Sequence, residues 1–275
     1  MKALTLLAAV LITLFTSCED VIDLDMPQGK KTLVVEGWLT NKSEPNFIKL
    51  YFTNTITAQS SLDMVGNAKI ILSDNVGNTE LLQEVNTGKY QIKTLKSIEG
   101  RTYTLKIESA AGNYEAKTEV KRLSMPIDSL TFKFEKKSAL YEKEGFYPRS
   151  HGQELEGKGD FIQVRLYKNG VYLNRDADFN LFSDEFVDGN YIANNLLSVK
   201  EPLVKDDLLK AETWSVTEDA LLFWLDIQIQ LQNGQLFATP LANTRTNIKK
   251  TSSNATDVIG YFGASLIHSV ESRVK

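Results

Sequence analysis

The chain has 275 residues and a formal net charge of −4, and 42% of its residues are hydrophobic. This composition is typical of a folded globular protein. The acidic balance argues against nucleic acid as a partner and against electrostatic attachment to anionic lipid, because both require excess positive charge. The single cysteine excludes a disulfide framework and a thiolate metal site.

The first 17 residues have the pattern of a bacterial lipoprotein signal peptide. Lys2 supplies a positive start, and a mainly apolar run over residues 3–15 follows it. That run is shorter than the about 20 residues that span a bilayer, but it fits the apolar segment of a secretory signal. Residues 14–18 read Leu-Phe-Thr-Ser-Cys, which resembles a lipobox, although Phe15 stands where leucine is usual.

We therefore predict that the signal is cleaved before Cys18, leaving residues 18–30 as an acidic tether. The resemblance to a lipobox implies that the Cys18 thiol carries diacylglycerol and that its new amine is acylated. These covalent lipids are the only cofactor we expect, and two or more acyl chains attach a protein stably to a membrane. The alternative is a lone buried cysteine behind an ordinary signal peptide.

Residues 31–122 are predicted to form an antiparallel β-sandwich of immunoglobulin or transthyretin-like type. Short β-rich runs recur at roughly 8–14-residue spacing with turn residues between them, as in such sandwiches. We expect Trp38 to pack inside this sandwich because of its aromatic bulk, although strand parity alone leaves either face open. The expected strands are residues 33–39, 46–52, 68–72, 80–85, 89–94, 101–109 and 114–120.

Residues 127–275 are predicted to form a β-rich domain that also contains one helix, with Pro126 marking the boundary. Two long polar insertions, residues 137–159 and 174–197, interrupt its strands, and we expect little regular structure in the first. Loops on a rigid scaffold often carry binding residues, so both insertions are candidate contact surfaces. Deletion of residues 140–157 is expected to leave folding intact.

A helix is predicted near residues 218–232. Thr217 is a suitable N-cap, and two acidic residues follow it in the first turn. An Asn-Gly pair at residues 233–234 supplies a stop. The alternation of Ile227, Ile229 and Leu231 favours a strand instead, so a strand remains the alternative.

Six aromatic residues in the two insertions are candidate partner contacts. Aromatic side chains bring a large contact area at small entropic cost, which suits an interface or a carbohydrate platform. The alternative is that they fold back and complete the core of the second domain. They are Phe146, Tyr147, Phe179, Phe182, Phe186 and Tyr191.

No motif in the chain indicates catalysis. His151 and His268 are far apart in sequence and lack zinc-site spacing, and no Gly-x-Ser-x-Gly motif is present. The acidic loop at residues 176–188 has the alternate spacing of calcium ligands but lacks the glycine and terminal glutamate of an EF-hand. Calcium binding there is left open, and we predict that the protein is not an enzyme.

Several short motifs follow one another along the chain. They are the lipobox with its acidic start, LVVEGWLT at 33–40, GKY at 88–90, GRTYTL at 100–105, GDF at 159–161, RLYKNG at 165–170, DEFVDG at 184–189, Pro240, Asn247-Ile248 and GYFGAS at 260–265. As an ordered set, they resemble the lipoprotein family catalogued as domain of unknown function 4249. Genes of that family commonly lie beside outer-membrane TonB-dependent receptors, so the resemblance implies a lipoprotein partner of such a transporter, analogous to Sus-type lid lipoproteins. It implies no catalytic residues.

The sequence thus predicts a non-enzymatic outer-membrane lipoprotein that acts as an accessory, lid or binding subunit of a TonB-dependent transporter in nutrient uptake. The acidic residues after Cys18 resemble the signal that exposes some outer-membrane lipoproteins at the cell surface, and the alternative is the periplasmic face. The competing function is a free-standing surface module that binds carbohydrate or protein, or a tethered degradative enzyme.

Overall fold

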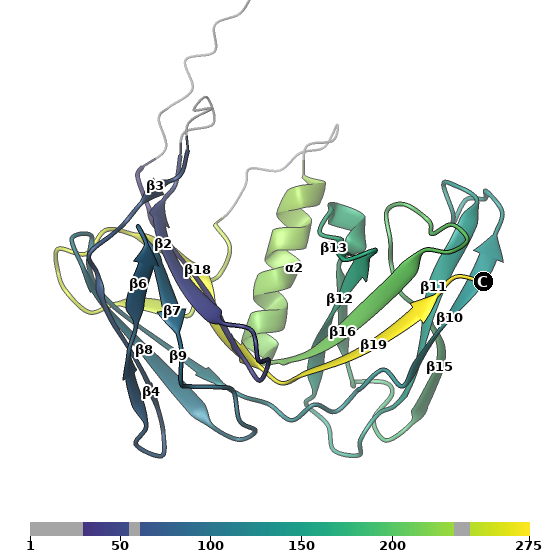
Figure 1. Ribbon diagram of the computed structural model, residues 1–275, viewed down its shortest axis with the longest axis horizontal. Coiled ribbons are helices and arrows are strands. Elements are labelled where there is room, and N and C mark those ends of the chain that lie inside the picture. The colour runs from purple at the N-terminus through teal and green to yellow at the C-terminus, as the bar shows by residue number, and fades with distance from the viewer. Residues whose placement is uncertain (1–29, 55–60, 234–242) are drawn as a thin grey trace, which may run out of the picture. The chain divides into compact units, whose positions relative to one another are not determined.

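Strands dominate the computed structural model, which describes residues 30–54, 61–233 and 243–275 (Figure 1). Within these residues there is one α-helix, so the predicted mainly β class with a helix is confirmed. Residues 31–275 belong to one compact unit. Cys18 and the predicted lipoprotein signal lie outside the described residues. In the described part of the chain, no helix is long and apolar enough to cross a membrane.

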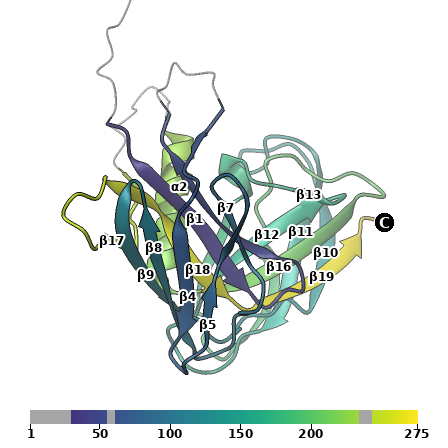
Figure 2. The ribbon, with the colours of Figure 1, turned by 60° about the vertical axis from the view of Figure 1, so that its left-hand side comes forward.

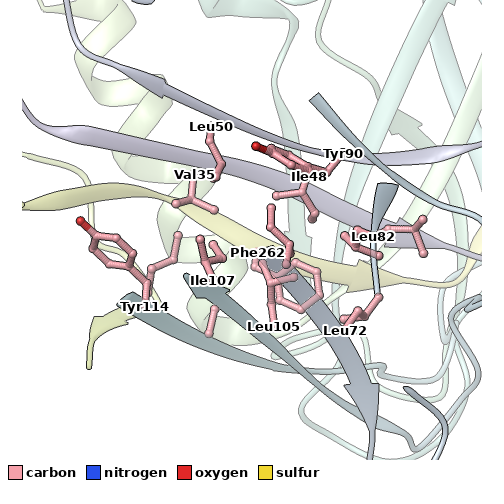
Figure 3. Close-up of a cluster of buried hydrophobic side chains, with 14 of the residues drawn as sticks. Val35, Ile48, Leu50, Leu72, Leu82, Tyr90, Leu105, Ile107, Tyr114 and Phe262 are labelled. Carbon is pink, nitrogen blue, oxygen red and sulfur yellow. The ribbon is translucent and has the colours of Figure 1, made fainter. Parts of the chain in front are cut away.

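Two sheets share one hydrophobic core, and we call this part the first β region. Its strands alternate buried and less buried residues, because every second residue of a strand points to the same face. Tyr103, Leu105 and Ile107 are buried in this way. Figure 3 shows Val35 and Phe262 of one sheet facing Leu105 of the other. The first sheet contains β1 (Leu33–Thr40), β2 (Asn46–Phe52), β3 (Asp63–Met64), β6 (Gln83–Asn86), β7 (Lys89–Ile92) and β18 (Val258–Ser265). The second contains β4 (Lys69–Asp74), β5 (Thr79–Leu81), β8 (Thr102–Ser109), β9 (Gly112–Glu119) and β17 (Ile248–Lys250).

Two strands from the end of the chain, which the sequence pattern placed in the second domain, lie in the sheets of the first β region. β17 pairs with β9, and β18 pairs with β1 in parallel, whereas the other strand pairs of the described residues are antiparallel. Gly260 makes the close approach of β18 possible. Its φ is +96°, and a Cβ there would lie 2.1 Å from the carbonyl oxygen of Val35.

The second β region consists of two further sheets around a separate core. Leu130, Leu166 and Leu209 are among the buried residues that these sheets share. One sheet has the order β10 (Ser129–Glu135), β11 (Gly145–Gln153) and β15 (Tyr191–Leu196). The other is built from β12 (Phe161–Lys168), β13 (Val171–Tyr172), β14 (Asn180–Ser183), β16 (Leu208–Val216) and β19 (Ile267–Arg273).

The prediction that residues 137–159 contain little regular structure is wrong. β11 lies in the middle of its sheet, and the second insertion contributes β14, β15 and a 3₁₀ turn, η1 (Asp176–Asp178). β11 contains glycine and proline, which are depleted in strands, so its sequence does not have a typical strand pattern. Gly152 is required there, because a Cβ would lie 2.2 Å from the carbonyl oxygen of Pro126. Deletion of residues 140–157 would remove this central strand, so the assumption that no core strand lies there is wrong, and we now expect the deletion to disrupt folding.

The helix α2 (Glu218–Gln232) confirms the predicted helix and excludes the strand alternative. The Thr217 hydroxyl caps it by accepting a hydrogen bond of 3.2 Å from the Ala220 amide. The helix contacts β18 of the first β region and β12 and β14 of the second. A single residue, Leu266, separates β18 from β19, so one stretch of chain runs directly between the two regions (Figures 1 and 2).

Candidate ligand-binding cleft

Trp38 lies on the outer face of its sheet, so the prediction that it packs inside the first sandwich is wrong. The core face of β1 takes Leu33 and Val35, and Trp38 has the opposite parity. Gly37 on the core face is covered by Ile48, whose Cδ1 would lie 2.2 Å from a Cβ at that position. The packing of neighbouring strands therefore determines on which face of the sheet Trp38 lies, and its aromatic bulk alone does not.

The Trp38 indole rests against β18. Trp38 is paired in register with Gly263, where a Cβ would lie 2.5 Å from the indole ring. Its Nε1 donates a hydrogen bond of 2.8 Å to the Ser265 hydroxyl. Tyr261 stacks on it with ring centroids 6.0 Å apart and an angle of 25° between the planes. The ring is thus fixed in orientation by β18.

All three tryptophans of the protein meet at this point. Trp38 comes from β1, Trp214 from β16 and Trp224 from α2. The ring centroids of Trp38 and Trp214 are 6.2 Å apart in an edge-to-face arrangement, and those of Trp38 and Trp224 are 5.9 Å apart. The cluster joins elements of both β regions and the helix, and such aromatic pairs add to the energy of burial.

Arg165 of β12 extends its guanidinium among the three rings. Its Cζ lies 3.6 Å from the ring centroid of Trp214, and the other two centroids are 5.3 Å and 5.7 Å away. Its Nε donates to Gln163 Oε1 at 3.0 Å, and it forms no ion pair with any carboxylate of the described residues. Removal from water lowers the pKa of Arg165, because burial disfavours the charged form, but an arginine remains protonated.

Glu212 is the buried carboxylate beside this cluster, and other groups already neutralise it. Lys42 and Lys210 lie 2.5 Å and 2.8 Å from its Oε1. Its Oε2 accepts hydrogen bonds from Tyr167 and from Trp214 Nε1. Burial alone would raise the pKa of Glu212, but the hydrogen bonds from Lys210 and Lys42 lower it overall. The charges of Glu212 and Glu36 act on Arg165 in the direction that raises its pKa, but neither carboxylate forms an ion pair with it in the described part of the chain.

A cavity of about 860 Å³ opens over these side chains, and we call it the tryptophan cleft. Its size falls within the roughly 300–1,000 Å³ of small-molecule sites. Trp224 Nε1 is buried and has no hydrogen-bond partner in the described part of the chain. The lining residues that matter most for chemistry are Glu36, Trp38, Lys42, Phe47, Lys49, Tyr51, Arg165, Tyr167, Trp214, Phe223, Trp224, Ile227 and Tyr261. The cleft thus combines aromatic walls with hydrogen-bond donors.

The six predicted contact residues do not form one surface. Tyr147 is buried in the second core, and Phe146 and Phe182 pack against that core. Phe179 is half-buried and contacts Trp224 at a centroid distance of 6.3 Å, beside the cleft. Only Phe186 and Tyr191 are open to solvent, with exposed fractions of 87% and 58%. Phe146, Tyr147 and Phe182 therefore complete the core of the second region, as the alternative stated. A partner role for Phe186 and Tyr191 stays a prediction.

The sequence pattern did not predict the tryptophan cleft. A usable signal was the rarity of tryptophan, since all three residues converge, but they lie on three elements that are distant in sequence. A protein-family model described as "Domain of unknown function (DUF4249)" matches residues 19–271, which include every residue of the cleft. No curated protein matches the chain.

Proposed function

The chain belongs to the DUF4249 family, and from this premise we propose that it is a ligand-binding lipoprotein of the outer membrane that serves a TonB-dependent transporter. One observation carries the binding role: Arg165 stands among three tryptophans in an open cleft, and no carboxylate of the described residues forms an ion pair with it. The proposed role is capture of a ligand without chemical conversion.

A purely structural role for the cluster explains less of the geometry. Cation–π contacts could hold the two β regions together, but a tightly packed joint does not need a cavity of about 860 Å³ over it. Placing a guanidinium among rings also removes water from it, which costs free energy unless new partners replace that water. A bound ligand would supply such a partner.

The lining defines the chemical class of the ligand. Tryptophan faces contact apolar or ring-shaped surfaces, and a guanidinium binds a carboxylate through two parallel hydrogen bonds. We therefore propose a ligand that has a ring or apolar face and carries a carboxylate, such as an acidic sugar or an aromatic acid.

The membrane and transporter parts of the proposal rest on sequence and family. The lipobox-like residues before Cys18 and the acidic residues after it support lipid attachment and exposure at the cell surface. Family membership supports the transporter partner through the gene neighbourhood that the resemblance implies. The second candidate, a free-standing surface module, would use the same cleft without a receptor.

Ligand binding can be tested by isothermal titration calorimetry of the detergent-solubilised protein. Glucuronate and indole-3-acetate serve as carboxylate probes, and glucose and indole are their neutral counterparts. Arg165→Lys should weaken carboxylate binding about 10- to 100-fold, since it removes a charge-assisted hydrogen bond worth roughly 1.5–3 kcal/mol. Arg273→Lys on the exposed end of β19 is the control and should bind like the wild type. Equal binding of charged and neutral probes, or no effect of Arg165→Lys, would refute the ligand class.

Partner identity needs a separate measurement. Affinity purification from solubilised outer membranes, followed by mass spectrometry, should recover a TonB-dependent receptor with the tagged lipoprotein. Cys18→Ala should release the protein from membranes and abolish labelling by a clickable fatty acid. Recovery of no receptor at wild-type expression, with ligand binding intact, would favour the free-standing module.

A further inference from the structure

Three carboxylates converge in the second β region, away from the residues that line the tryptophan cleft. Glu154 follows β11, Asp160 precedes β12 and Asp184 follows β14. Each contributes one oxygen that lies within 4.8 Å of an oxygen from the other two. Their exposed fractions are only 1%, 5% and 3%. We call this group the carboxylate cluster.

Arg122 compensates only part of the negative charge of the carboxylate cluster. Its Nε and Nη2 lie 3.0 Å and 2.6 Å from Asp160 Oδ2, and Nη2 also donates to backbone carbonyl groups of residues 155–157. Within the described ranges, no lysine or arginine forms an ion pair with Glu154 or Asp184. Burial raises the pKa of Glu154, and the charges of Asp184 and Asp160 raise it further, against a hydrogen bond from the Gly189 amide.

Two carboxylate oxygens of the cluster have no hydrogen-bond donor. Glu154 Oε1 and Asp184 Oδ2 are buried without a partner in the described part of the chain. The second oxygen of Glu154 accepts the hydrogen bond from the Gly189 amide. A buried carboxylate oxygen that has lost its water needs a proton, a donor or a cation, because desolvation without compensation is costly. These oxygens are therefore positioned for a ligand that the described residues do not supply.

We propose that Glu154, Asp160 and Asp184 bind one Ca²⁺ ion. The donor set contains only oxygen, which hard cations prefer and which disfavours zinc and copper. Ca²⁺ accepts ligands at about 2.3–2.6 Å in flexible geometry, so two of its ligands can be up to about 5 Å apart, as the separations in the cluster allow. Mg²⁺ demands closer and more regular ligands and is the less suitable ion.

The ion would fix the segment between β14 and β15, which carries the exposed Phe186. The Asp184 carbonyl oxygen accepts hydrogen bonds from the amides of Val187 and Asp188. Asp188 Oδ1 in turn accepts a bond of 2.7 Å from the Gly157 amide. A cation held by Glu154, Asp160 and Asp184 would therefore tie the segment after β14 to the end of β11 and the start of β12. Phe186 lies within that segment, so calcium would control its presentation.

The acidic loop that the sequence left open as a calcium site contributes only one of these ligands. Asp176 and Asp178 are already engaged, since Lys200 lies 2.6 Å from Asp176 and Arg175 lies 3.1 Å from Asp178. Asp184 joins instead with two acids from outside the loop. Spacing within one loop could not reveal a site whose ligands come from three segments.

The test uses the full-length lipoprotein in detergent, stripped with EGTA and dialysed into metal-free buffer. Isothermal titration calorimetry with CaCl₂ should give one site per chain, with MgCl₂ binding at least about tenfold more weakly. Ca²⁺ should also raise the melting temperature of the wild type. Asp184→Asn should lose most of both effects, whereas Glu185→Gln, an exposed neighbour outside the cluster, should retain them.

The wild-type measurements keep the proposal testable even where Asp184→Asn fails to fold. Absence of heat and of any Ca²⁺-dependent thermal shift in the wild type would overturn it. So would an equal shift in wild type and a folded Asp184→Asn or Glu154→Gln variant. A metal-free protein that gains stability as the pH falls, with no response to Ca²⁺, would show that a proton on Glu154 relieves the repulsion instead.

Discussion

The two β regions differ in what they bury, although both consist of short strands in paired sheets. Within the described ranges, the first region buries one carboxylate, Asp74, and its core is almost wholly apolar. The second region buries a larger set of acids, namely Glu154, Asp160, Asp178, Asp184, Asp207 and Glu212. Buried charge is costly unless it is paired or coordinated, so it concentrates where a site requires it. We therefore assign scaffolding mainly to the first region, and metal and ligand binding to the second region and to the cleft beside it.

The largest expected effect tests the scaffold role of the first region. Leu105→Ala removes a fully buried side chain from the middle of the core and should lower the free energy of unfolding by about 2–5 kcal/mol. Leu81→Ala on β5 is the control, because Leu81 is largely exposed and should change stability by no more than about 0.5 kcal/mol. Urea denaturation measures both values. A loss below about 1 kcal/mol for Leu105→Ala would contradict a tightly packed core.

The next effect concerns the contact between Trp38 and β18. Gly263→Ala places a methyl group 2.5 Å from the indole ring, so the ring must move, at a cost of about 1–3 kcal/mol in stability. The same change should weaken binding of the carboxylate probes, because Trp38 forms part of the wall of the cleft. A double-mutant cycle with Trp38→Leu measures the coupling, and additive effects would show that the ring and Gly263 are not in contact.

Acid should weaken the first region through Asp74. Burial would raise the pKa of Asp74, but hydrogen bonds from Asn78 and Val76 and the charge of Arg101 lower it overall. A lowered pKa in the folded state gives stability that is present above the unfolded pKa and is lost as the pH falls. Asp74→Asn should therefore cost about 1–2 kcal/mol at pH 7 and much less near pH 3. Urea denaturation at both pH values checks this.

The carboxylate cluster should respond to pH with the opposite sign when metal is removed. The pKa of Glu154 is raised, so its contribution to stability is present below the unfolded pKa and is lost as the pH rises through the folded pKa. In EGTA, Glu154→Gln should consequently be more stable relative to the wild type at pH 8 than at pH 5. The same sign for Asp74→Asn and Glu154→Gln would remove the difference between the two regions.

The sequence predicted the features that depend on neighbouring residues. Alternation located the strand that buries Tyr103 and Ile107, and the cap at Thr217 located α2. It did not predict β11, whose glycines meet a distant backbone, or the parallel strand β18, which depends on Gly260. Pairings of this kind join segments far apart in the chain, and single-strand patterns contain no information about them.

The candidate sites were the least predictable part for the same reason. The Trp38 ring packs against Gly263, which lies 225 positions later in the chain, and against Trp224 of the helix. Each of these residues alone is typical of an ordinary strand or helix. The carboxylate cluster likewise unites three segments, and with 35 acidic residues in the chain no pair could be singled out in advance.

The smallest expected effect on stability concerns the exposed aromatic residues of the second region. Phe186 and Tyr191 make little contact with the core, so the Phe186→Ala, Tyr191→Ala double variant should change the free energy of unfolding by no more than about 0.5 kcal/mol. Exposed aromatic residues are nevertheless favoured hot spots of interfaces. The double variant should therefore co-purify less receptor from solubilised membranes, and this loss should resemble the effect of EGTA if calcium orders the segment. Val171→Ala, another exposed apolar position, is the control. Undiminished recovery of the same partners by the double variant would place the interface elsewhere on the protein.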